Sequence, residues 1–240
     1  MYNQTVARLT YKALLGRRRA LLLCALPLLL LIVAGAVRGL TGADDQVTTQ
    51  LLGGFAMATM VPLIGVIAGT GAIGPEIDDG SVVYLLAKPL KRSSIIVTKL
   101  LVAIGVTVTF SAIPTLLAGY ILNGNSQQIA VAYAVAAAIA SVAYSALFLL
   151  LGTVSRHAVV IGLVYALIWE ALFGSMVPGA RALSVQQWAL ALAQKVADSG
   201  AGISSEVGVT TGVVLLVAAT FGGTWYASRK LRTLTLAGEE

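Results

Sequence analysis

The residues of this chain that could do chemistry gather in one short segment, residues 74–93. Three acids, Glu76, Asp78 and Asp79, precede a short apolar stretch, and a cluster of Lys and Arg residues follows it. Acids in the first turn of a helix favour the positive end of its dipole, and Pro75 suits the first helical position, where its missing N–H costs nothing. The pattern predicts a short helix that ends near Pro89, with an apolar middle that a partner protein would cover.

Elsewhere the chain offers little for catalysis. The one histidine, His157, and the one cysteine, Cys24, fall in different segments, so we predict no nucleophilic grouping and no metal site. The sequence has no G-x-x-x-x-G-K-[ST] phosphate loop. We therefore predict that the chain is not an enzyme, carries no cofactor of its own, and does not bind nucleic acid.

The composition is that of an integral membrane protein. Hydrophobic residues make up 58% of the 240 residues and charged residues 11%, whereas a soluble domain carries about 25% charged residues. A transmembrane helix needs about 20 mostly apolar residues. Six runs qualify, at residues 20–38, 51–73, 94–122, 128–152, 158–177 and 207–227. We predict an all-α, polytopic membrane protein with six transmembrane helices in a single domain, residues 1–240.

The basic residues predict the orientation of these spans. An even number of spans places both termini on one side of the membrane. On that model only three of the 16 Lys and Arg residues, Arg38, Arg181 and Lys195, fall on the opposite side. The positive-inside rule then predicts that both termini and residues 74–93 are cytoplasmic.

Residues 1–19 have an amphipathic pattern of their own. Val6, Leu9, Ala13 and Leu14 recur at helical spacing among basic residues, which is typical of a helix that lies in the membrane interface. The alternative is that this segment extends the first span into the cytosol.

The extracytoplasmic loop, residues 178–206, also predicts a helix. Val185, Trp188, Leu192 and Val196 recur at helical spacing, which indicates an amphipathic or re-entrant helix. Trp188 would then anchor it at the outer interface, and a lid over a pathway is a further possibility for this helix.

Small residues in the spans predict close helix packing, because lipid provides no hydrophobic drive between helices. Small-xxx-small spacing occurs in the first, second and sixth spans, at the pairs Gly35 and Gly39, Gly65 and Gly69, and Gly208 and Gly212.

Glu170 is the one acidic residue within a predicted span. An ionisable group inside the membrane is a functional candidate that faces the bundle or a wet cavity. It could contact substrate, gate a pathway or carry a proton, or it could hold helices together by hydrogen bonds. Arg38, at the outer end of the first span, is a possible salt-bridge partner.

The stretch EIDDGSVVYLLAKPLKRSSIIVTKLL resembles the loop between the second and third spans of type-2 ABC transporter permeases. In that family an acid precedes G-[ST]-x-x-x-L-L-x-x-P-x-x-R and a Lys-bearing entry to the next span. The matching residues are Glu76, Gly80, Ser81, Leu85, Leu86, Pro89, Arg92 and Lys99. The six spans, the N-terminal helix and the outer helical loop are similar to that fold more loosely.

The resemblance implies a permease subunit of an ABC exporter in the bacterial cell membrane. It implies a homodimer that works with two cytoplasmic ATPase subunits, which bind the ATP and Mg. The helix after the second span would dock in a groove of the ATPase and transmit its closure. The residues implied in this coupling are Glu76, Ile77, Asp78, Asp79, Gly80, Ser81, Tyr84, Leu85, Leu86, Pro89 and Arg92.

A hydrophobic or amphipathic cargo is expected, because the spans supply almost no fixed charge to recognise an ionic solute. Two alternatives stay open. One is an ion- or proton-coupled carrier that uses Glu170. The other is an ABC-type mechanical complex that moves no cargo.

Overall fold

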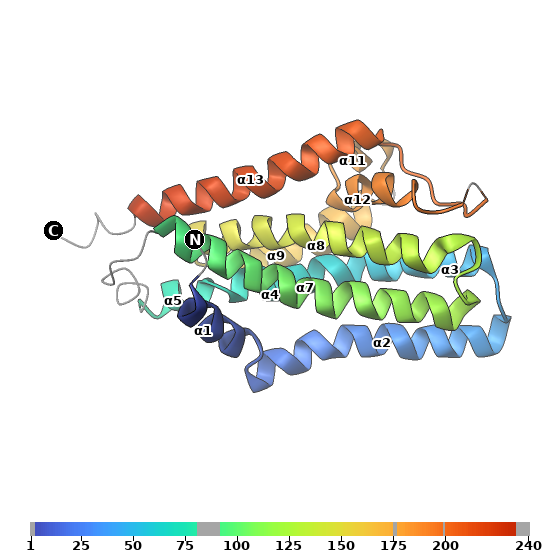
Figure 1. Cartoon of the computed structure of the whole chain (residues 1–240), viewed down its shortest axis with the longest axis horizontal. Coiled ribbons are helices and arrows are strands. Elements are labelled where there is room, and N and C mark those ends of the chain that lie inside the picture. The colour runs from blue at the N-terminus through green and yellow to red at the C-terminus, as the bar shows by residue number, and fades with distance from the viewer. Residues whose placement is uncertain (1–2, 81–91, 175–176, 199, 234–240) are drawn as a thin grey trace.

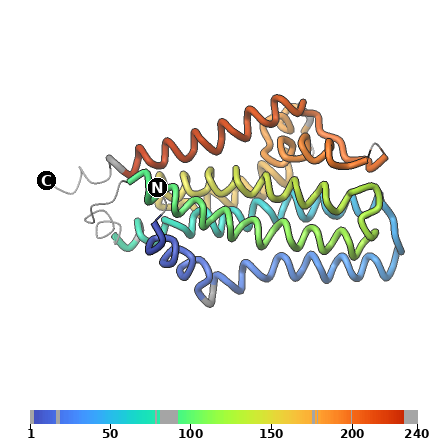
Figure 2. The backbone as a smooth tube through the Cα atoms, viewed as in Figure 1, coloured from blue at the N-terminus to red at the C-terminus, as the bar shows by residue number. Residues whose placement is uncertain are grey.

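The structure is a computed structural model that describes residues 3–80, 92–174, 177–198 and 200–233. Within these ranges all regular structure is helical, as predicted. The long helices lie side by side in an elongated bundle (Figures 1 and 2). Helices α1 (Gln4–Leu14) and α5 (Gly74–Asp78) lie at one end of it, and α3 (Asp45–Leu51) and α12 (Val185–Ala193) lie at the other (Figure 1).

Five helical stretches among the described residues are long and apolar enough to cross a membrane. The second is composite, because α3 continues into the π-helix η1 (Leu52–Met60) and then into α4 (Val61–Gly71). The other four contain α2 (Arg17–Thr41), α7 (Arg92–Asn123), α8 (Ile129–Val154, preceded by the 3-10 turn η2, Ser126–Gln128) and α13 (Val209–Thr233).

The predicted fifth span, 158–177, forms a shorter apolar helix, Ala158–Phe173. It consists of α9 (Ala158–Val164) and the π-helix η3 (Tyr165–Phe173). Over the described residues this helix is shorter than the roughly 20 residues that a transmembrane helix needs. The count of six spans is therefore not confirmed, because only five helical stretches among the described residues are long and apolar enough to cross a membrane.

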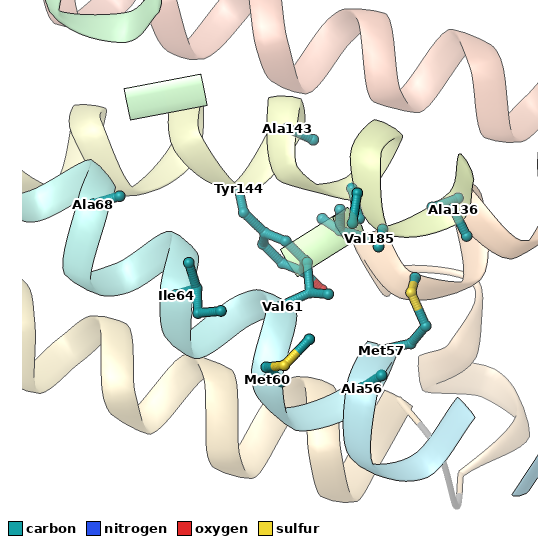
Figure 3. Packing of buried hydrophobic residues seen from close by; sticks show 14 of the residues in the cluster. Ala56, Met57, Met60, Val61, Ile64, Ala68, Ala136, Ala143, Tyr144 and Val185 are labelled. Atoms are coloured by element: carbon teal, nitrogen blue, oxygen red, sulfur yellow. The ribbon is translucent and has the colours of Figure 1, made fainter. Parts of the chain in front are cut away.

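Helix α8 is the centre of the bundle. It packs against α4, α7, α12 and α13, and its inward face is built largely from alanines. Figure 3 shows the ring of Tyr144 reaching from α8 toward Ile64 and Val61 of α4. Polar side chains also join helices here, since Ser111 of α7 and Ser141 of α8 lie 2.7 Å apart, Oγ to Oγ. The edge helices α2 and α13 expose apolar side chains, which suits contact with lipid: Leu21, Leu28, Ile32, Phe221 and Trp225.

The close packing predicted from small residues is confirmed between α4 and α8. A Cβ atom on Gly65 would lie 2.8 Å from Tyr144 Cβ, and one on Gly69 would lie 2.6 Å from Phe148 Cβ. Only glycine allows this approach of the two backbones. The other two pairs differ, because Gly35 and Gly39 have nothing within 4 Å. In the third pair, Gly212 packs against the carbonyl of Trp188, whereas Gly208 meets only Thr211 Oγ1, 4.0 Å away.

Helix α1 is separate from α2, so the alternative that residues 1–19 merely extend the first span is wrong. Asn3 caps it by accepting hydrogen bonds from the N–H groups of Thr5 and Val6. Its buried face consists of Val6, Ala7, Thr10 and Leu14, whereas Leu9 and Ala13 are exposed.

The glycine contact predicts a large difference between two equivalent substitutions. Gly69→Ala would force α4 away from α8, and overpacking costs about 1–3 kcal/mol. Gly105→Ala in α7, where nothing lies within 4 Å, gains helix propensity instead. Thermal unfolding in detergent should show a lower Tm for Gly69→Ala and an equal or higher Tm for Gly105→Ala. Equal melting of the two variants would contradict the packing.

Candidate functional site

The acidic segment begins as predicted but its helix is shorter. Pro75 and Glu76 lie in the first turn of α5, which ends at Asp78. Gly80 follows at φ +68, a left-handed conformation that glycine adopts without strain. The helix predicted to run on to Pro89 therefore ends before Gly80.

The described candidates of this segment lie in different surroundings. Glu76 and Ile77 are half-buried, and Ile77 packs against the core. Asp79 and Gly80 are exposed, and Arg92 begins α7. The remaining coupling candidates lie outside the described residues: Ser81, Tyr84, Leu85, Leu86 and Pro89.

A buried ion pair joins α5 to α7. The ammonium of Lys99, whose side chain is fully buried, lies 2.7 Å from Oε1 of Glu76, whose side chain is 29% exposed. The same ammonium donates to the carbonyl oxygen of Ala72 at 2.6 Å. A buried charge needs such partners, since an unpaired ion in the interior costs several kcal/mol.

Two basic side chains donate hydrogen bonds to the carbonyl groups at the carboxyl end of α4. Lys99 reaches the carbonyl of Ala72, and Arg19 of α2 donates to the carbonyl of Gly71 at 3.2 Å. The last carbonyls of a helix lack intrahelical partners and carry its negative dipole end, so basic side chains stabilise them. These bonds attach α2 and α7 to the point where the chain leaves α4 for α5.

Helix α1 completes this end of the bundle. The backbone N–H of Asn3 donates to Oγ1 of Thr98, the neighbour of Lys99 in α7, at 3.1 Å. We call residues Gly71 to Glu76, where the 74–93 segment begins, the loop root. Helices α1, α2 and α7 are thus all attached at or close to the loop root. The sequence match singled out Lys99 and Glu76 but indicated neither their pairing nor the role of Arg19.

A second polar cluster lies around Glu170, which is fully buried. Its carboxylate accepts hydrogen bonds from the hydroxyl of Tyr165 at 2.7 Å and from that of Ser184 at 2.5 Å. It also accepts one from the backbone N–H of Val185, the first residue of α12, at 3.0 Å. The positive end of the α12 dipole stabilises a carboxylate at this position. Arg38 instead donates to the carbonyl of Leu122 at 2.8 Å, so the salt bridge considered between Arg38 and Glu170 is not formed.

Helix α12 is inserted into the bundle and is not a surface amphipathic helix. All of its residues except Leu192 are buried, and it packs between α8 and α13. Its Gln186 side chain donates to the carbonyl of Gly53 in η1 at 3.1 Å. Trp188 donates to the carbonyl of Ala182 and is only 8% exposed, which differs from the interfacial anchor predicted for it.

Both π-helices are therefore attached to the same element. Glu170 of η3 binds the start of α12, Gln186 of α12 binds η1, and η1 packs against η3. Segments of π-helix are rare and occur frequently at functional sites. The sequence indicated Glu170 through its isolation in an apolar run, but Gln186 carried no such signal.

The ion pair of Lys99 predicts a strong effect of its removal. Lys99→Met would remove the ammonium group that Glu76 and the Ala72 carbonyl share. We expect the free energy of unfolding to fall by about 2–3 kcal/mol. This is less than for a fully buried pair, because Glu76 is partly exposed to solvent. Lys195→Met, at an exposed lysine of the opposite end, is the matched control. Thermal unfolding in detergent should give a lower Tm for Lys99→Met than for Lys195→Met. Equal Tm values would show that the ion pair of Lys99 does not stabilise this end of the bundle.

The donors around Glu170 predict that even an isosteric change is harmful. In Glu170→Gln the charge-assisted hydrogen bonds to the carboxylate become weaker neutral ones, and Ser184 must turn its hydroxyl to accept from the new NH₂ group; we expect this to cost about 1–3 kcal/mol of the free energy of unfolding. Glu206→Gln alters a partly exposed glutamate paired with Arg181 and should have little effect. We expect a clearly lower Tm for Glu170→Gln only. Indistinguishable thermal unfolding curves would show that the carboxylate does not hold α12.

The comparisons with known proteins agree with this architecture. The family model described as ABC-2 family transporter protein matches residues 4–222, from the start of α1 into α13. No curated protein matches the chain. The matched region contains the loop root, the Glu170 cluster, the first four helical stretches that are long enough to cross a membrane, and the first half of α13. The chain belongs to the ABC-2 transporter family and is a multi-pass membrane permease subunit of an ABC transporter.

Proposed function

We propose that this permease is the membrane part of an ATP-driven exporter, with residues 74–93 as the contact that receives movement from a cytoplasmic ATPase. Two copies of the chain would work with two ATPase subunits, which bind the ATP and Mg. Family membership supports the class of function. The observation that carries the coupling role is the bracing of the loop root by Lys99 and Arg19.

A contact that transmits force needs a stiff connection to the parts it moves. The loop root is bonded to α2 and α7 by two charged side chains, and α4 is packed against α8 without space for a methyl group. A displacement of the loop would therefore move α4 together with α7 and α8. Interiors packed in this way transmit strain because they have little compressibility.

The orientation in the proposal places the α5 end of the bundle in the cytoplasm of a bacterial cell. Helix α1, α5 and the last residues of α13 lie at this end (Figure 1). It carries many of the basic residues, in agreement with the positive-inside rule: Arg8, Lys12, Arg19, Arg156, Arg229 and Lys230.

The outer end supports an export pathway for a hydrophobic or amphipathic cargo. Helix α12 is inserted there between α8 and α13 and is attached to η1 and η3, and we infer that it gates a route along the short α9–η3 helix. The apolar side chains that this helix exposes would suit such a cargo: Val160, Val164, Leu167, Ile168 and Leu172. Glu170 already accepts three hydrogen bonds, which favours a structural role over proton coupling.

The coupling role is tested by a charge placed in the apolar part of the segment. The tagged chain is purified from its native membranes, co-purifying proteins are identified by mass spectrometry, and ATPase activity is measured. We expect a protein with a phosphate loop to co-purify with the wild type. Tyr84→Asp and Ile77→Asp should reduce its recovery and the activity at least five-fold, because an apolar contact would have to bury a carboxylate.

Thr5→Asp is the control, since Thr5 is an exposed residue at the start of α1 where an acid suits the helix dipole. A Tm measurement identifies any variant that is simply unfolded, which matters most for the half-buried Ile77. The absence of any ATPase with the wild-type chain, or full recovery with a folded Tyr84→Asp, would overturn the proposal.

A further inference from the structure

A cavity of about 200 Å³ opens at the α5 end of the bundle, among α2, α4, α5 and the turn between α8 and α9. Its lining includes Arg19 of α2 and Arg156 of the α8–α9 turn. Gly74 and Pro75 of the loop root also line it. The coupling role described above uses neither Arg156 nor the cavity itself.

The polar part of the cavity is suited to an anion. Two guanidinium groups line it and no acidic residue does. Arg19 gives one N–H group to Gly71, and in the part of the chain that the structure describes its other N–H groups have no protein partner. Arg156 is exposed. The planar fork of a guanidinium matches phosphate oxygens, and two such groups around one space favour a phosphate.

The rest of the lining is apolar. Leu22, Ile67 and Val159 contribute to the wall, and the first and last of these are 57% and 53% exposed. They continue into the exposed apolar faces of α2 and α9 along the length of the bundle. A ligand that satisfies both parts carries a phosphate at one end and hydrocarbon chains at the other.

We propose that this cavity binds the phosphate of an anionic phospholipid between Arg19 and Arg156, with its acyl chains along Leu22 and Val159. Basic pockets between helices at the cytoplasmic face are known sites for lipid headgroups. Because Gly74 and Pro75 line the same cavity, the bound lipid contacts the loop root and stabilises its position. The site shares the orientation of the proposed function but does not need the ATPase partner, so the lipid test can fail while the coupling test succeeds, and the reverse.

The test uses the full-length chain purified in a neutral detergent. Thermal unfolding is measured with increasing phosphatidylglycerol, with phosphatidylcholine and with inorganic phosphate, and native mass spectrometry counts the lipids retained. We expect phosphatidylglycerol to raise Tm in a saturable manner, since a ligand that binds only the folded state stabilises it. Phosphatidylcholine, which is zwitterionic, should raise it far less.

Arg156→Gln is the main variant, because Arg156 is exposed and its loss should not disturb folding. We expect it to weaken the phosphatidylglycerol effect at least ten-fold in apparent Kd. Arg8→Gln removes the same charge from an exposed position of α1 at the same end and should leave the Kd unchanged. Stabilisation by inorganic phosphate at the same concentrations would keep the anion site and assign it to a free phosphate. Equal stabilisation by both lipids, or equal Kd values for the two variants, would overturn the proposal.

Discussion

The buried ammonium of Lys99 is the constraint on which this structure depends most. A charge inside the bundle is tolerated only where acceptors surround it, and here they are the carboxylate of Glu76 and the carbonyl of Ala72. These two contacts join α7, the third span, to the carboxyl end of α4 in the second span and to the first turn of α5. Arg19 adds the first span through the adjacent carbonyl. The loop root thus lies where three spans are bonded together.

At the opposite end of the bundle a buried carboxylate, that of Glu170, accepts hydrogen bonds at the start of a helix. Helix α12 begins inside the bundle, where its first residues are buried, and Glu170 accepts a hydrogen bond from one of their N–H groups and from two hydroxyl groups. In an apolar medium every backbone group must find a partner within the protein. Lys99 and Glu170, two buried charged residues of the described bundle, therefore contact helix termini. Lys99 contacts the carboxyl end of α4, and Glu170 contacts the amino end of α12.

Between these two ends the packing of α4 against α8 provides the mechanical link. Gly65 and Gly69 bring the two backbones together with no room for a side chain, and interiors packed in this way transmit strain. The π-helix η1 continues α4 toward Gly53, which accepts a hydrogen bond from Gln186 of α12. A continuous set of bonded and packed elements thus runs from the loop root to α12 at the opposite end of the bundle.

The sequence by itself determined the features that depend on local pattern. Hydropathy located the apolar runs, the distribution of basic residues predicted the orientation, and the spacing of Gly65 and Gly69 indicated close packing of the second span without indicating its partner. Pro75 and Glu76 marked the start of α5. Only the tertiary structure decided which charged groups meet, because the bonded residues are 23 positions apart for Glu76 and Lys99 and 52 for Arg19 and Gly71. It also decided that Trp188 is buried. Such outcomes follow from how helices pack in three dimensions, which no local periodicity encodes.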